Sequence, residues 1–330
     1  MKNLERVRSI KGRRFLFKVE NSASSPEYLK YDDLRNKVWG DPEDRLAGGR
    51  NMMCENYLHD GGSLYIGVFA ESVGGGFAQD PEHLVGFCYG FAGVKDKEVG
   101  FRKPENIQFY SQYTGVREDF QGWGLGVLIK EFQRDQVLNL MSIRTITCTY
   151  DPLTSVNAYR NVHCFGMKVL EYVESAYSDF AGLLNRPDVP RDRFYVFWDL
   201  RKQAETPGYD RKTASAPEHR VIVTRPAEVS GKSGPIRLEV VEELRLDHRA
   251  EVLTVAVPLD FYRMLRETDV QDERVRNIPL EWRLRTRQAF QSLLEAGYRI
   301  IDFCLRKGRE QRSFYVLKKA KTRLLKGGRT

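Results

Sequence analysis

A glycine-rich turn between a strand and a helix constrains the fold of this chain most. Residues 116–126 read Val-Arg-Glu-Asp-Phe-Gln-Gly-Trp-Gly-Leu-Gly. They follow a predicted strand at 106–116 and precede a predicted helix, ending near Met141, whose apolar residues recur at helical spacing. Because glycine has no Cβ atom, several main-chain N–H groups can converge on one point. With the positive end of the helix, these donors favour an anion, and a diphosphate fits.

Two familiar phosphate motifs do not match this turn. The P-loop requires Lys and then Ser or Thr after its last glycine, whereas Gly126 is followed by Val127. The dinucleotide fingerprint requires G-x-G-x-x-G, whereas Gly122, Gly124 and Gly126 are spaced G-x-G-x-G. A strand that opens into Q-x-x-G-x-G is a different signature.

This signature resembles the pyrophosphate loop of the GNAT superfamily of acyl-CoA-dependent N-acyltransferases, which reads Q/R-x-x-G-x-G/A between the fourth strand and the third helix. Val116 stands five residues before Gln121, where that family usually ends the strand with valine. The resemblance covers roughly residues 13–200, and the later order of strand, helix, Gly166 and two strands agrees with it. Residues 150–161 look like an uncharacterised bacterial branch of predicted acetyltransferases.

The resemblance implies acetyl-CoA as co-substrate and no metal. It assigns the CoA diphosphate to the main-chain N–H groups of Gln121 through Gly126. The pantetheine arm would pair with backbone groups near Thr114 and Val116 as an added strand, and a later helix would flank it. The implied cofactor-binding residues are Thr114, Val116, Gln121, Gly122, Trp123, Gly124, Leu125, Gly126, Asn157 and Asn161.

The implied chemistry is direct attack of a neutral amine on the thioester, which needs a base, an acid and an oxyanion donor. The chain departs from the family's pattern at two positions. Val162 stands where a tyrosine usually protonates the thiolate, and Tyr110 where some members carry a glutamate base. The catalytic candidates are therefore Asp151, Tyr159, His163 and Tyr110. For each of them a structural role stays open, since helix histidines commonly pack at surfaces and Asp-Pro starts turns.

The expected fold class is α/β (α+β), with a GNAT-like mixed, mostly antiparallel central sheet flanked by helices and a smaller C-terminal α/β domain. Ser155 is expected to cap a short helix that ends before Gly166. Further helices are expected at 26–39 and 49–58. Besides 106–116, strands are expected at 15–20, 64–70, 84–94, 143–150, 168–177 and 193–200.

A length of 330 residues suggests two domains. Residues 1–200 are predicted to be the acyl-CoA-binding domain. The Pro- and Gly-containing stretch 201–235 is predicted as a linker with one short strand at 221–223. Residues 236–330 are predicted as a second α/β domain with a basic tail at 318–330. That domain has predicted strands at 236–246 and 252–257, then a helix closed by Gly297 and a hairpin over 300–317.

The second domain also ends in a helix, a glycine and two strands. It is either a degenerate half-copy of the first fold or an unrelated helix–hairpin unit. We expect it to shape substrate access or a dimer interface, so a homodimer stays open.

The net charge is +8, and residues 201–330 carry 28 Lys+Arg against 18 Asp+Glu. The basic excess therefore lies outside the predicted catalytic domain. The expected function is N-acetyl transfer to a small-molecule or peptide amine. Two alternatives stay open: a non-catalytic acyl-CoA-binding or regulatory protein, and a nucleic-acid-associated protein that uses the basic part, although nucleic acid is not the expected partner.

The chain has no apolar run long enough for a membrane helix and no secretory signal, so a cytoplasmic protein without a membrane partner is expected. The five cysteines are expected to be reduced, mostly buried thiols, because they form no C-x-x-C pair. They are Cys54, Cys88, Cys148, Cys164 and Cys304.

Overall fold

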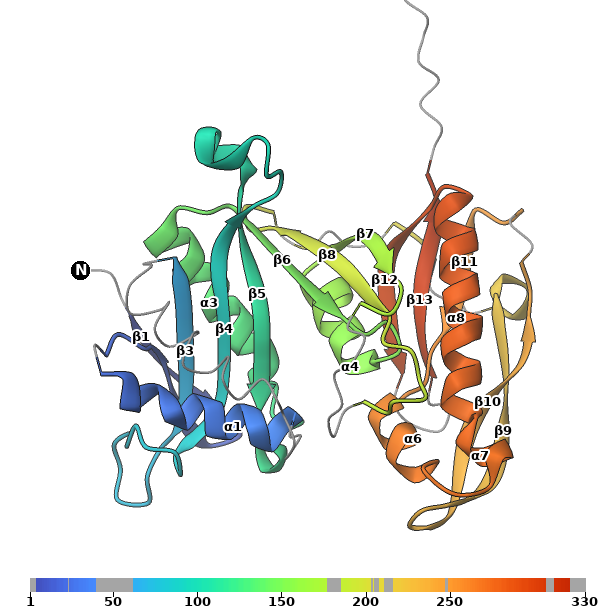
Figure 1. Cartoon of the computed structure of the whole chain (residues 1–330), viewed down its shortest axis with the longest axis horizontal. Helices are drawn as coiled ribbons and strands as arrows, with labels where there is room; N and C mark the ends of the chain where they lie inside the picture. The colour runs from blue at the N-terminus through green and yellow to red at the C-terminus, as the bar shows by residue number, and fades with distance from the viewer. Residues whose placement is uncertain are drawn as a thin grey trace, which may run out of the picture. The chain divides into compact units, whose positions relative to one another are not determined.

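An eight-stranded sheet dominates the computed structural model (Figure 1). Its strands are β1 (Glu5–Ile10), β2 (Arg13–Val19), β3 (Ser63–Ala70), β4 (Leu84–Val94), β5 (Ile107–Val116), β6 (Thr145–Tyr150), β7 (Lys168–Val173) and β8 (Arg193–Asp199). Their order is β1-β2-β3-β4-β5-β6-β8-β7. Neighbours from β1 to β5 are antiparallel, whereas β5 and β6 are parallel. The mixed, mostly antiparallel sheet of the predicted fold class is confirmed.

The structure describes residues 4–22, 24–39, 62–176, 185–202, 204, 208–210, 216–246, 249–306 and 312–320. The helix predicted over 49–58, Cys54 and most of the basic tail lie outside these ranges. The cysteines inside them (Cys88, Cys148, Cys164 and Cys304) are free thiols, as predicted. No helix in the described ranges is long and apolar enough to cross a membrane.

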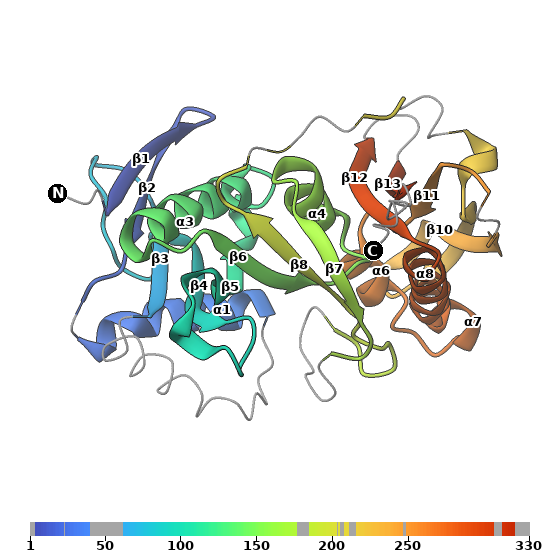
Figure 2. The ribbon, with the colours of Figure 1, turned by 90° about the horizontal axis from the view of Figure 1, so that it is seen from above.

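Two helices cover opposite faces of strands β3 to β5 (Figure 2). A 3-10 turn at Ser25–Tyr28 leads into α1 (Leu29–Trp39), and α3 spans Leu125–Met141. Tyr31 and Leu34 of α1 join the aromatic core on one face. Ile129 and Phe132 of α3 are buried on the other. These positions agree with the predicted helices.

Strand β1 was not predicted, because its side chains are mostly exposed and show no apolar alternation. It pairs along its whole length with β2. The two strands are joined by Lys11 and Gly12, whose φ angles are 49° and 79°. Positive φ at both central residues is the geometry of a tight hairpin turn.

The chain forms two compact units whose boundaries differ from the predicted domains. Unit 1 comprises Met1–Thr149, Asp179–Pro187 and Tyr195–Gln203, and unit 2 comprises Tyr150–Ser178, Asp188–Phe194 and Ala204–Thr330. The difference from a boundary at residue 200 has a packing cause within unit 2. The ring of Phe194 lies 4.8 Å from that of Phe290 and 5.6 Å from that of Tyr315.

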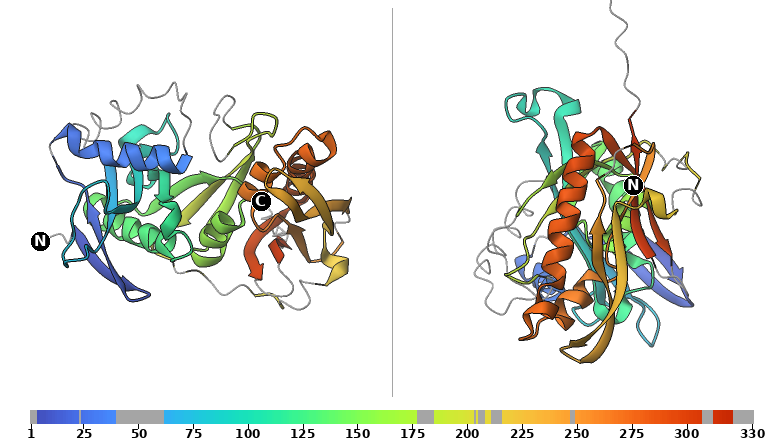
Figure 3. Two further views of the ribbon diagram at one scale, coloured as in Figure 1. Left: turned by 90° about the horizontal axis from the view of Figure 1, so that it is seen from below. Right: turned by 90° about the vertical axis from the view of Figure 1, so that its right-hand side faces the viewer.

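Unit 2 contains two small sheets and a long helix. Its elements are α4 (Ser155–Ala158), a π-helix (Tyr159–Cys164), β9 (Ile222–Gly231), β10 (Gly234–Leu244), β11 (Val252–Ala256), α6 (Phe261–Glu267), α7 (Glu273–Arg276), α8 (Ile278–Glu295), β12 (Tyr298–Arg306) and β13 (Arg312–Lys319), besides β7 and the start of β8. β9 and β10 form a ribbon, and the other sheet has the order β11-β13-β12. Helix α8 lies along these strands (Figure 3), and Trp282 Nε1 donates to the Glu239 carbonyl at 2.9 Å.

Two local predictions were wrong. Residues 224–231, predicted as linker, extend the short strand predicted at 221–223 into β9. About half of its side chains are half-buried and the others mostly exposed. It contains Pro226, which pairs with Glu239, so the sequence pattern is that of a connection. Ser155 does not cap α4, because Thr154 is the residue before the helix and Ser155 Oγ donates to the Leu259 carbonyl.

The strand order around the two helix–glycine units tests whether the second domain is a degenerate half-copy of the first fold. The strands around the first helix–glycine unit are ordered β6-β8-β7, and those around the second are ordered β11-β13-β12. In each case the last strand lies between the two earlier ones. Gly166 and Gly297 both have positive φ, 60° and 84°. A different strand order would have excluded a repeat, so the hypothesis stands.

Candidate functional site

Strands β5 and β6 separate soon after they begin to pair. The register joins Phe109 to Ile146 and Tyr110 to Thr147, and it contains no further pair. From Ser111 to Val116, strand β5 continues beside β4 alone among the described strands. This part of β5 therefore presents main-chain groups on an open edge, to which an extended ligand can add as a strand.

A β-bulge lies at the point of separation. Tyr89 pairs with Tyr113 and Gly90 with Ser111, so Gln112 is the extra residue on β5. The Gln112 side chain is exposed. A bulge interrupts the hydrogen-bond ladder and redirects the groups beside it, and such irregularities are frequent next to active sites.

The glycine-rich turn begins α3. Gly122 and Gly124 have φ angles of 76° and 82°, in the left-handed region that favours glycine. Gly124 is the N-cap of α3, and no side chain caps the helix. Within the described ranges, the N–H groups of residues 122–126 donate to no protein acceptor. We call these five donors the amide cradle.

Gln121 has a different place in the turn. Its main-chain N–H donates to the Glu118 carbonyl at 3.1 Å, and its side-chain Nε2 donates to the Val116 carbonyl at 3.3 Å. Both bonds hold the end of β5 against the turn. Among the described residues, the main-chain donors of this turn that have no protein acceptor are therefore those of the amide cradle.

The β1–β2 turn brings a lysine to the cradle. Lys11 Nζ lies 3.4 Å from the Gly122 carbonyl and 5.1 Å from the centre of the Trp123 ring. The Trp123 ring also packs edge-on against Phe15, at 6.1 Å. Lys11 was not among the predicted site residues. The sign in the sequence was a Lys-Gly pair between two short polar stretches. That pair can be recognised as a hairpin turn only once β1 is assigned as a strand.

Behind β5, on the face covered by α3, lies a buried polar group. Lys130 Nζ donates to Ser111 Oγ and, at 3.2 Å, to Gln133 Oε1. Lys130 is 2% exposed. Burial raises the pKa of the neighbouring Cys88 thiol to about 12, although the charge of Lys130 lowers it. This cluster supports β5 directly after its last pair with β6.

Tyr110 lies on β5 at that last pair. Its hydroxyl is 3.4 Å from Thr149 Oγ1 of β6, and its ring is 5.7 Å from that of Phe91. The side chain is half-buried. Tyr110 thus bridges the two strands where they diverge, and its catalytic role stays a prediction.

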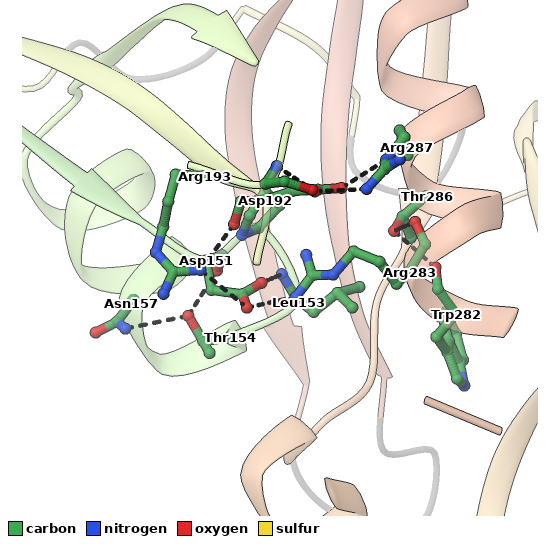
Figure 4. Close-up of polar contacts among 12 residues, drawn as sticks. Asp151, Leu153, Thr154, Asn157, Asp192, Arg193, Trp282, Arg283, Thr286 and Arg287 are labelled. Atoms are coloured by element: carbon green, nitrogen blue, oxygen red, sulfur yellow. Dashed lines mark hydrogen bonds and ion pairs between the residues drawn. The ribbon is translucent and has the colours of Figure 1, made fainter. Parts of the chain in front are cut away.

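Asp151 follows β6 and joins a network of charged groups in unit 2 (Figure 4). Its carboxylate accepts the Leu153 N–H at 2.9 Å and Arg283 Nη2 at 2.5 Å. Arg193 Nη1 lies 3.5 Å away. Burial by itself lowers the pKa of Arg283, but the Asp151 carboxylate, together with Tyr172 and Asp192, raises it more, so the result lies above the usual value. These contacts favour a bracing role for Asp151, and its catalytic role stays a prediction.

The remaining candidates lie on α4 and the π-helix. Asn157 Nδ2 donates to Thr154 Oγ1 at 3.1 Å, and Asn157 Oδ1 accepts Arg160 Nη2 at 2.8 Å. Asn161 is 1% exposed. The rings of Tyr159 and His163 are stacked, with centroids 4.7 Å apart. Unit 2 therefore brings Tyr159 and His163 together and ties Asn157 to the start of the helix.

No group of three or more His, Cys, Asp or Glu side chains in the described part of the chain is arranged to hold a metal ion. The donors available for a ligand in unit 1 are the amide cradle, the open edge of β5 and Lys11. Main-chain N–H groups and a lysine suit an anionic ligand, and the open edge suits an extended one.

No protein-family model and no curated protein matches the chain. Among solved structures, it is similar to mutant forms of the spermidine/spermine N-acetyltransferase SpeG from Vibrio cholerae, with 10% identity and a TM-score of 0.38 over 56% of this chain and 96% of that one. NAA60 of Arabidopsis thaliana in complex with acetyl-CoA has 13% identity and a TM-score of 0.41, over 57% and 99%. A GNAT-family acetyltransferase from Streptococcus pneumoniae has 9% identity and a TM-score of 0.39, over 55% and 98%.

The order of the elements in the described part of residues 4–200 is the one expected from the resemblance. A turn of Gln-x-x-Gly-x-Gly joins β5 to α3, and β5 and β6 are parallel and splay apart. A helix, Gly166 and strands β7 and β8 follow. The described part of residues 4–200 thus has the expected GNAT-like arrangement of strands and helices.

Proposed function

We propose that this chain is an acetyl-CoA-dependent N-acyltransferase that acts on a small-molecule or peptide amine. One observation carries the proposal. The bulge at Gln112, the open edge of β5 up to Val116 and the amide cradle follow one another along a single strand–turn–helix segment. In the same order, they match the thioester carbonyl, the extended arm and the diphosphate of an acyl-CoA.

The diphosphate would accept hydrogen bonds from the amide cradle at the positive end of α3. Lys11 would add a positive charge beside it. The amides of the pantetheine arm would pair with the main chain near Thr114 and Val116 on the open edge of β5. In this proposal, acetyl-CoA is bound almost entirely by main-chain groups.

In the chemical step, the neutral amine attacks the thioester carbonyl. A C–N bond forms, the C–S bond breaks, the amine loses a proton and the CoA thiolate gains one. A main-chain N–H turned out of the ladder at the bulge would stabilise the oxyanion of the tetrahedral intermediate. Tyr110, which bridges the diverging strands, is the residue proposed to contact the acceptor.

The proposal is tested by calorimetric titration with acetyl-CoA. Gly124→Glu places a carboxylate in the amide cradle, and Gly75→Glu is its matched control. The two glycines have φ angles of 82° and 83°, and an added Cβ would meet no atom within 4 Å at either. The cost in backbone strain is therefore equal, and only the first carboxylate opposes a diphosphate. We expect micromolar binding by the wild type and by Gly75→Glu, and none by Gly124→Glu.

Absence of binding by folded wild-type protein, or equal binding by all three proteins, would overturn the proposal. Consumption of acetyl-CoA with a panel of amines then tests catalysis. Binding without consumption by any amine would favour a non-catalytic acyl-CoA-binding protein.

A further inference from the structure

Three buried polar side chains meet behind β5, between its last pair with β6 and the bulge. Tyr110 forms that last pair, and Ser111 follows it directly before the extra residue Gln112. Ser111 is 4% exposed, and its partners on α3, Lys130 and Gln133, are 2% and 0% exposed. All of these residues belong to unit 1, as do the amide cradle and the open edge of β5.

The hydrogen bonds of this cluster run from the helix to the strand and back. Lys130 Nζ donates to Ser111 Oγ, and the Ser111 hydroxyl donates in turn to Gln133 Oε1 at 2.9 Å. Lys130 Nζ also donates to Gln133 Oε1 at 3.2 Å. The three groups thus form a closed triangle, in which the Ser111 hydroxyl is held by α3 both as an acceptor and as a donor.

The amide of Gln133 has only one orientation open to it. An ammonium group has donors and no acceptor, so the amide oxygen must face Lys130. The amide nitrogen Nε2 is also buried, and it has no hydrogen-bond partner among the described residues. A buried donor without an acceptor costs stability, whereas an apolar side chain of similar size would pack α3 on the sheet without that cost. Packing alone therefore does not account for the cluster, and this favours a role at the neighbouring bulge.

The cluster holds β5 where strand pairing is weakest. A bulge leaves its extra residue unpaired and disrupts the ladder of hydrogen bonds around it. On one side of β5, Gln112 has no partner in the register with β4. On the other side, the register with β6 ends at Tyr110. The bonds from Ser111 to α3 therefore fix the main chain directly before the bulge, at a point where neither neighbouring strand does.

We propose that Ser111, Lys130 and Gln133 are positioning residues of the acyl transfer. The two helix side chains hold Ser111, and Ser111 sets the direction of the main-chain N–H at the bulge that stabilises the oxyanion. This inference rests on the proposed function. None of the three side chains binds the substrate or exchanges a proton with it. Because a misplacement of about 1 Å can cost about 100-fold in rate, a donor on an unpaired stretch of strand needs such support.

The first test is infrared spectroscopy of bound acetyl-CoA that is isotopically labelled at the thioester carbonyl carbon. A hydrogen bond to the carbonyl oxygen lowers its stretching frequency. We expect the band in Ser111→Ala to lie at a higher frequency than in the full-length wild type, because the donor is less well aligned. Ser63→Ala is the matched control, since Ser63 of β3 is also buried and its Oγ lies 3.4 Å from the Tyr89 hydroxyl. Its band should coincide with that of the wild type.

The second test is kinetic, with an amine found in the panel. Ser111→Ala should lower kcat about tenfold or more and leave the KM for acetyl-CoA within about twofold, because the amide cradle and the open edge of β5 are unchanged. Gln133→Met keeps a side chain of similar length and removes the acceptor that Ser111 and Lys130 share. It should have the same two effects, so either variant carries the test if the other does not fold. Ser63→Ala should leave kcat and KM unchanged.

The outcomes separate this inference from the proposed function. If the wild type binds acetyl-CoA, and the carbonyl band and kcat are the same in Ser111→Ala, Gln133→Met and the wild type, the inference is wrong and the proposed function stands. Lower melting temperatures of the two variants with an unchanged band and kcat would show that the cluster only stabilises the fold. If folded wild-type protein binds no acetyl-CoA, the proposed function fails, and this inference fails with it.

Discussion

Arg287 binds the buried carboxylate of Asp192 with two hydrogen bonds, from Nε to Oδ2 at 2.9 Å and from Nη2 to Oδ1 at 2.7 Å (Figure 4). The Tyr172 hydroxyl and the Ser175 N–H donate to the same carboxylate. Burial by itself raises the pKa of Asp192, but these bonds, Arg287 first, lower it more, and the result lies below the usual value. The ionised form of Asp192 is thus favoured in the folded protein.

This lowered pKa predicts an acid-dependent loss of stability. The contribution of Asp192 is complete above the unfolded pKa of about 4 and is lost as the pH falls through the lower folded value. We expect the free energy of unfolding, measured with urea between pH 7 and pH 3, to fall less steeply with acid in Asp192→Asn than in the wild type. Asp33→Asn, at an exposed position on α1, is the control and should follow the wild type. Parallel curves for wild type and Asp192→Asn would contradict the prediction.

Removing Arg283 should destabilise unit 2. Its guanidinium is buried and binds Asp151 through Nη2. Arg283→Met keeps much of the side-chain volume but leaves the nearly buried carboxylate with the more distant Arg193. We expect a loss of about 3 kcal/mol in urea unfolding, and partial recovery in the double variant with Asp151→Asn. A double variant no more stable than Arg283→Met would show that the two residues are not coupled.

Reversing the charge of Lys11 should weaken diphosphate binding. Its ammonium lies beside the Gly122 carbonyl at the amide cradle. Because the group is solvent-exposed, the effect is modest: about 1 kcal/mol, or roughly fivefold in the Kd for acetyl-CoA at low salt, and less at high salt. Calorimetry on Lys11→Glu at two ionic strengths measures it, with exposed Lys97→Glu as the matched control. Equal affinities for the two variants would remove Lys11 from the site.

Glycine at position 90 is required by close packing next to the bulge. An added Cβ would lie 2.4 Å from a Phe109 ring atom and 2.5 Å from the Tyr110 carbonyl oxygen. We expect Gly90→Ala to cost about 2 kcal/mol of stability by overpacking. Gly93→Ala is the control, since it lies on the same strand and its Cβ would meet nothing within 4 Å. Thermal unfolding of the two variants should separate them clearly, and equal melting temperatures would show that β5 can shift.

The parts of the fold that could be predicted are those with strong local patterns. Strands β3 and β4 are apolar and mostly buried, and both were expected as strands. The start of α3 was predicted because the turn needs positive φ, which glycine supplies at low cost. Strand β1 was missed because its side chains are mostly exposed and show no apolar alternation. Most of β9 was missed because it contains Pro226, a residue typical of connections.

The site was predictable only where main-chain groups make it. The turn at 121–126 could be predicted from its glycine spacing, and the structure adds five N–H groups there that have no acceptor among the described residues. The sequence alone could not show which residues far apart along the chain are in contact. Asp302 Oδ1 lies 2.8 Å from His163 Nδ1 although the two residues are 139 positions apart, and the bulge beside Asp302 appears only in the strand register. An aspartate inside the apolar stretch Ile-Ile-Asp-Phe was the one local sign.

The alternation of the chain between its two units has a consequence for its biosynthesis. Unit 2 begins at Tyr150, yet its β11-β13-β12 sheet is completed only by β13, at Arg312–Lys319. Tyr315 on that strand closes the aromatic cluster around Phe194. Until the ribosome has made β13, the residues after β6 lack their partners. Unit 2 therefore cannot complete its fold before β13 is synthesised, and a message truncated before β13 would yield a chain with that surface exposed.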